Sequence, residues 1–168
     1  MILKKIIALG EIVTGKEINL TEEGDLAAFI NKLRNDSDYC LKVVSVTINS
    51  SSLTDAQLEE IITLCPNIQK LDLILCSALS VLPENLGDLT QLTSLDLILC
   101  DALTHLPERL GNLTQLTSLD LRGCIALTHL PERLGDLTQL TSLNLSECIR
   151  LTHLPDRLGD LTQLTSLD

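Results

Sequence analysis

Cysteine, histidine and aspartate each recur along this chain at a fixed spacing of 24 residues. These side chains are the ones that most often bind metal ions or act as nucleophiles and bases. The cysteine column is Cys76, Cys100, Cys124 and Cys148, the histidine column is His105, His129 and His153, and the acidic column is Asp72, Asp96, Asp120, Asn144 and Asp168. The chemistry open to each column depends on where the period places it.

The four periodic cysteines do not form a metal-binding pattern. No C-x-x-C pair occurs, and parallel side chains one repeat apart would not converge on a tetrahedral zinc ion. We interpret each as a small buried hydrophobic residue with a weak S–H hydrogen bond to a loop carbonyl. Cys40 and Cys65 are interpreted in the same way. We expect reduced thiols and no bound metal.

The histidine column permits a metal stripe or a pH sensor, but an exposed position on the outward side of a turn is favoured. A catalytic Cys–His pair is not expected, because the cysteines should point into the core. No phosphate-binding glycine loop and no G-x-S-x-G motif occurs. Threonines and serines such as Thr93 and Ser94 also repeat, as ordinary strand pairing. We therefore predict no catalytic residues, no cofactor and no enzyme.

The acidic column allows three interpretations. A basic partner could neutralise it, calcium could bridge it, or the side chains could point outward and remain solvated. If only one interpretation applies, solvated side chains are favoured. Carboxylates at this spacing should also raise the pKa values of some of their neighbours.

Composition narrows the class of partner. The 168 residues carry a formal net charge of −11, are 45% hydrophobic and only 1% aromatic. This length fits one domain or one array of repeats, and its core has to be aliphatic. The acidic balance argues against nucleic acid and against an anionic membrane surface, and a basic protein surface is the more natural partner.

Proline, glycine and leucine follow the same period. Pro83, Pro107, Pro131 and Pro155 are each 24 residues apart, and one unit reads L-x-x-L-x-L-x-x-C-x-x-L-x-x-L-P-x-x-L-G-x-L. This pattern resembles the leucine-rich repeat family, well over residues 41–168 and loosely over 17–40. The 24-residue form is similar to repeats of plant intracellular resistance proteins and of proteins that bacterial pathogens deliver into host cells. "CPNI" at 65–68 is similar to the longer, cysteine-containing repeats.

The resemblance implies an α/β fold, a right-handed leucine-rich repeat solenoid (horseshoe) with a parallel sheet on its concave face. We expect five or six strands. Two true helices are expected in the N-terminal third, one over 22–33 and one after a capping box at Thr54–Gln57. Only 3₁₀ or short helical turns are expected in the later repeats.

We divide the chain into two parts. Residues 1–40 are expected to form a cap with a degenerate first repeat, and residues 41–168 to form the leucine-rich repeats. The stretch 1–15 has too short an apolar run for a signal peptide, so we interpret it as a strand or cap. The sequence stops within a strand motif. A fragment, an abrupt natural end, or cover by another chain, including self-association through the last repeat, all remain open.

The differences between repeats predict the binding surface. Residues 103–126 and 127–150 differ at 112/136, 120/144, 122/146, 123/147 and 126/150, and four of these five pairs lie on or just after the strand's outward face. The expected partner-binding residues are Asp72, Ile74, Leu75, Asp96, Ile98, Leu99, Asp120, Arg122 and Glu147. Exposed aliphatic residues here would form a binding patch, unless they pack on the following loop.

We therefore expect a non-catalytic protein-binding module. By resemblance it could be a bacterial effector, cytoplasmic or secreted into a host cell without a classical signal peptide. The alternatives are a substrate-recognition adaptor of a ubiquitin ligase and a self-assembling structural solenoid.

Overall fold

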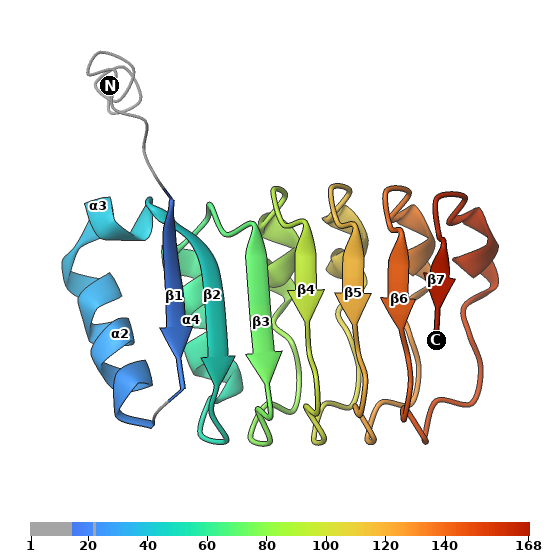
Figure 1. Ribbon diagram of the computed structural model, residues 1–168, viewed down its shortest axis with the longest axis horizontal. Helices are drawn as coiled ribbons and strands as arrows, with labels where there is room; N and C mark the ends of the chain where they lie inside the picture. The colour runs from blue at the N-terminus through green and yellow to red at the C-terminus, as the bar shows by residue number, and fades with distance from the viewer. Residues whose placement is uncertain (1–14, 22) are drawn as a thin grey trace, which may run out of the picture.

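The computed structural model describes residues 15–168 except residue 22, and in this part seven strands form one parallel sheet. The strands are β1 (Lys16–Leu20), β2 (Val43–Asn49), β3 (Lys70–Ile74), β4 (Ser94–Asp96), β5 (Ser118–Asp120), β6 (Ser142–Asn144) and β7 (Ser166–Leu167). They lie side by side in chain order (Figure 1). The expectation of five or six strands is too low, because the degenerate first unit and the last two-residue strand both join the sheet.

The helical segments follow the expected division. They are α2 (Glu23–Asn35), α3 (Ser37–Cys40) and α4 (Asp55–Leu64), then the 3₁₀ turns η1 (Glu84–Asp88), η2 (Glu108–Asn112), η3 (Glu132–Asp136) and η4 (Asp156–Asp160). The capping box forms: Thr54 N–H donates to Gln57 Oε1 at 2.9 Å, and Gln57 N–H donates to Thr54 Oγ1 at 3.3 Å. The short α3 is an addition to the expected elements. The expected N-terminal cap over 1–14 and the predicted helix start at residue 22 lie outside the described residues.

The sheet forms one layer and the helical segments the other (Figure 1). This arrangement of stacked strand–turn–helix units confirms the expected α/β solenoid. The sheet is open from β1 to β7 and does not curl into a horseshoe over this length. We call the surface away from the helical layer the open sheet face. Among the described residues, no helix is both long enough and apolar enough to cross a membrane.

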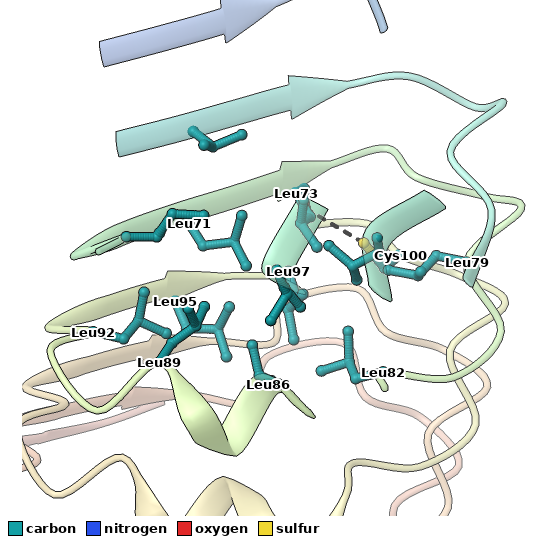
Figure 2. Packing of buried hydrophobic residues seen from close by; sticks show 14 of the residues in the cluster. Leu71, Leu73, Leu79, Leu82, Leu86, Leu89, Leu92, Leu95, Leu97 and Cys100 are labelled. Carbon is teal, nitrogen blue, oxygen red and sulfur yellow. Dashed lines mark hydrogen bonds between the residues drawn. The ribbon is translucent and has the colours of Figure 1, made fainter. Parts of the chain in front are cut away.

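Leucine columns fill the space between the layers. In β3, Leu71 and Leu73 are two residues apart, so they share the inward face, and both are fully buried. They pack with leucines of the return segment, such as Leu86 of η1, and with the next repeat (Figure 2). Strand register repeats this layer, since Leu71 pairs with Leu95, then Leu119. Stacking buries what one repeat alone would leave exposed.

Threonine hydroxyls support this register before β4, β5, β6 and β7. Thr117 Oγ1 donates to Thr93 O at 2.9 Å, and Thr141 Oγ1 donates to Thr117 O at 2.9 Å. The predicted hydroxyl ladder is therefore a set of bonds to the backbone of the preceding repeat.

An arginine ladder joins the 3₁₀ turns on the opposite side of the molecule. Arg133 donates to Asn112 Oδ1 of the preceding repeat at 2.9 Å and to its own Asp136 Oδ2 at 3.0 Å. Arg157 also lies 2.6 Å from Asp136 Oδ1. The Asn112/Asp136 difference between copies therefore belongs to this ladder and not to the open sheet face.

Candidate functional site

The cysteine column lies in the core, as expected. Cys100 Sγ donates to Leu73 O at 3.4 Å (Figure 2). Cys124 Sγ donates to Leu97 O at 3.1 Å, so each thiol bonds to a carbonyl of the preceding repeat. Burial raises the pKa of the Cys124 thiol to about 12. A thiol held protonated in this way is a poor nucleophile and a poor metal ligand. In the described part of the chain, no group of three or more His, Cys, Asp or Glu side chains could hold a metal ion.

The histidine column lies on the surface, also as expected. The His105 and His129 rings are parallel within 2°, with centroids 6.3 Å apart. Thr104 Oγ1 lies 2.9 Å from His105 Nδ1, and Thr128 has the same contact with His129. Both rings are exposed, whereas all six cysteine thiols are buried.

The acidic column crosses the open sheet face in register. Asp72 pairs with Asp96, and Asp96 with Asp120. The expectation of solvated side chains is wrong for Asp72, which is only 7% exposed. Thr47 Oγ1 donates to Asp72 Oδ2 at 3.0 Å from the neighbouring β2, and Lys70 Nζ lies 3.1 Å from the same oxygen. These two side chains cover the carboxylate.

Asp96 shows the expected effect of neighbouring charges. Burial raises the pKa of the Asp96 carboxyl, and the charges of Asp72 and Asp120 raise it further, while Lys70 opposes them. The next members of the column instead accept backbone bonds: Asp120 Oδ1 accepts from Arg122 N–H, and Asn144 Oδ1 from Ser146 N–H, each at 2.9 Å. At residue 144 the column carries the neutral amide of asparagine in place of a carboxylate.

Replacing Asp96 by asparagine is expected to stabilise the protein by roughly 0.2–1 kcal/mol at neutral pH, because it removes a like charge across the ladder. The pKa of Asp96 is raised in the folded state, so ionised Asp96 destabilises the fold fully at pH values above that pKa. The destabilisation is lost as the pH falls towards the pKa of the unfolded state. Urea unfolding of the parent and Asp96→Asn at neutral and at acidic pH measures the difference. A stabilisation that grows on acidification would contradict this account.

The aliphatic pairs lie where the strands end. β4 stops at Asp96, so Ile98 and Leu99 belong to the turn that follows it. Ile98 is half-buried, as is Ile74, which ends β3, whereas Leu75 is 47% exposed and Leu99 is 41% exposed. The two alternatives left open by the sequence therefore divide between the positions: the isoleucines are partly covered, and the leucines face solvent.

Leu75 and Leu99 have left-handed backbones, with φ of 56° and 57°. The equivalent residues Gly123 and Glu147 share this conformation, with φ of 74° and 63°. The left-handed region costs a leucine about 1–2 kcal/mol, and glycine almost nothing. The Leu99 side chain extends over the next repeat, where a Cβ atom on Gly123 would lie 2.5 Å from Leu99 Cδ2. The chain therefore keeps two exposed leucines at positions where glycine would fit better.

Two further exposed aliphatic residues were missed from the sequence. Ile125 is 42% exposed and Ile149 is 78% exposed, and each follows the left-handed position by two residues. The corresponding residues of the two earlier repeats are Ser77 and Asp101. Comparison of all four copies, rather than of two, would have found this exchange. We call Leu75, Leu99, Ile125 and Ile149 the edge stripe.

Charged residues of the expected site lie beside the edge stripe. Arg122 is exposed, two residues after Asp120 in the acidic column, and forms no ion pair with another described residue. Glu147 is exposed at the last left-handed position. The arrangement offers an apolar edge next to an acidic sheet face, with the guanidinium group of Arg122 beside it.

Comparisons with known proteins establish the fold. No protein-family model and no curated protein matches the chain. Among solved structures, a leucine-rich repeat protein of Leptospira interrogans is 24% identical with a TM-score of 0.56, over 91% of this chain and 41% of that one. The ectodomain of the Arabidopsis thaliana receptor kinase GASSHO1/SCHENGEN3, solved with Casparian strip integrity factor 2, is 24% identical with a TM-score of 0.53, over 78% of this chain and 16% of that one.

The leucine-rich repeat domain of the type III effector XopL is 23% identical, over 76% of this chain and 50% of that one, but its TM-score of 0.45 reflects a loose superposition. The chain thus spans half or less of the length of these three structures. At these identities the similarity concerns architecture and not a shared partner.

Proposed function

Because the chain has the leucine-rich repeat fold, we propose that it is a non-catalytic module that binds a protein partner. The binding surface of this proposal consists of the edge stripe and the adjoining acidic column on the open sheet face. The observation that carries it is the left-handed, exposed conformation of Leu75 and Leu99. Backbone strain kept at an exposed apolar residue is typical of ligand-binding sites, since stability alone would favour its removal.

The composition of the surface supports the same function. Interfaces commonly combine an aliphatic or aromatic centre with a polar rim. Here Leu75 and Leu99 are neighbours across consecutive repeats, with the Leu75 N–H donating to Ile98 O at 2.9 Å. The acidic column and Arg122 lie next to them. A protein surface with apolar side chains and an excess of positive charge is complementary to this set.

Replacing Leu75 and Leu99 together by glycine is expected to weaken partner binding by about 2 kcal/mol or more. The free energy of unfolding is expected to change by less than about 1 kcal/mol. The side chains are 47% and 41% exposed, so glycine loses part of their burial, and the relief of the left-handed strain offsets this loss. Leu154→Ser is the matched control, because Leu154 is 44% exposed but lies outside the edge stripe.

Affinity capture with quantitative mass spectrometry, followed by titration of the captured protein, measures the change. The proposal requires a protein that the parent and Leu154→Ser retain and that Leu75→Gly/Leu99→Gly loses. Equal capture by all three folded proteins would refute it. Capture of this chain alone would support a self-assembling solenoid instead.

Two narrower assignments belong to the same proposal. A role as an effector inside a host cell is supported by the resemblance of the 24-residue repeats to those of pathogen proteins, and secretion of the tagged chain by a pathogen would test it. An adaptor role in a ubiquitin ligase is supported only by the longer repeat around α4, and ligase subunits among the captured proteins would favour it.

A further inference from the structure

One buried carboxylate oxygen on the open sheet face lacks a hydrogen-bond donor. Asp72 Oδ2 accepts from Thr47 and lies near Lys70, but Asp72 Oδ1 has no partner although the side chain is about nine-tenths buried. A buried acceptor left without a donor costs free energy, so such an atom requires an explanation, and a bound water, ion or ligand is one. Thr47 satisfies the carboxylate from the β2 side. On the β4 side the Asp96 side chain lies against Asp72, and an ionised carboxylate accepts hydrogen bonds but donates none.

The charge around this oxygen favours a cationic ligand. Asp72, Asp96 and Asp120 lie in register on adjacent strands, and Lys70 is their one ion-pair partner among the described residues. Three carboxylates therefore share one ammonium group. The raised pKa of Asp96 is consistent with this excess of negative charge.

The shape of the site favours a planar organic cation over a metal ion. Described residues do not provide a cluster with metal-ligand geometry. Adjacent strands are about 4.8 Å apart, so two carboxylates on neighbouring strands suit a ligand that donates in two directions. A guanidinium group has five N–H donors in one plane and is weakly hydrated, whereas an ammonium is a compact, strongly hydrated charge. Lys70 already supplies the ammonium, at Asp72 Oδ2.

We propose that the open sheet face binds an arginine side chain of its protein partner between Asp72 and Asp96. The apolar residue next to that arginine packs on Leu75 and Leu99, at the ends of the same two strands. This inference rests on the proposed function and specifies its partner as a segment that carries arginine beside an aliphatic or aromatic residue.

The test uses two small probes of nearly the same shape, one cationic and one neutral. N-acetyl-arginine amide and its neutral isostere N-acetyl-citrulline amide are titrated at low salt into ¹³C-labelled protein, and the side-chain carboxyl resonances are followed by NMR. We expect the arginine probe to shift the resonances of Asp72 and Asp96 saturably and to lower the pKa of Asp96, because a bound cation favours the ionised form. We expect no such change with the citrulline probe.

Variants make the test specific. Asp96→Asn should lower the affinity for the arginine probe by about tenfold. It should fold, because Asn144 occupies the same place two repeats later. Asp156→Asn, at an exposed residue of η4, should leave the affinity unchanged. The proposal is overturned if the arginine probe shifts the Asp156 resonance as much as that of Asp96, or if the citrulline probe causes the same shifts. It is also overturned if the two variants bind the arginine probe equally well, or if calcium chloride causes the same saturable shifts.

The result is separable from the proposed function. If the arginine probe fails while protein capture still depends on Leu75 and Leu99, the module binds a partner without this arginine. If the probe binds as expected while capture is independent of those leucines, the cation site stands and the edge stripe is not the binding surface.

Discussion

Replacing Gly111 by alanine is expected to destabilise the solenoid by about 1–3 kcal/mol. The reason is close packing, because the backbone of Gly111 is not left-handed. A Cβ atom at residue 111 would lie 2.6 Å from the carbonyl oxygen of Arg133 and 2.8 Å from Arg133 Cβ, in the next repeat. Those atoms are backbone or rigidly attached to it, so the added methyl group has to separate η2 from η3. The packing of consecutive 3₁₀ turns would be lost at one junction.

Gly159 provides a matched control within the same chain. It occupies the equivalent position in η4, and a Cβ atom there would meet nothing within 4 Å. Gly159→Ala should be neutral or stabilise by up to about 1 kcal/mol, because alanine restricts the unfolded chain. Chemical denaturation of both variants measures the contrast. If Gly111→Ala is as stable as Gly159→Ala, the close approach of η2 and η3 does not require glycine at residue 111.

The layer architecture could be predicted from the sequence because it depends on periodicity. A 24-residue step with leucines two apart specifies strands that share an inward face, and Pro107 followed by five residues before Leu113 leaves room for a 3₁₀ turn only. The capping residues Thr54 and Gln57 specified α4. The cysteine column followed from the same period, since a residue repeated between inward leucines is buried with them.

The candidate site could be predicted only in part, because its properties depend on neighbours that differ between repeats. The burial of Asp72 requires Thr47 and Lys70, which belong to the irregular N-terminal units. The left-handed turn at Leu75 and Leu99 was hidden by the leucines themselves, and Gly123 was its single sequence signal. Whether the residues named for partner binding bind one stays a prediction.

The largest loss of stability is expected from Leu119→Ala, at about 2–5 kcal/mol. Leu119 lies in β5, is 1% exposed, and pairs with Leu95 on one side and Leu143 on the other. Removing most of its side chain leaves a cavity between two repeats that cannot collapse without breaking the register of both. Because each repeat contacts only its neighbours, the array is also expected to unfold less cooperatively.

Leu167→Ala is the control for this cavity effect, because Leu167 continues the same column in β7 and is 50% exposed. It should cost about 1 kcal/mol or less, since the truncated side chain was already half in water. Urea titrations followed by circular dichroism give both the midpoint and the m-value of each variant. A broad transition with a reduced m-value for Leu119→Ala alone would locate the loss of coupling at β5. Equal losses for the two leucines would mean that burial between repeats is not what stabilises this chain.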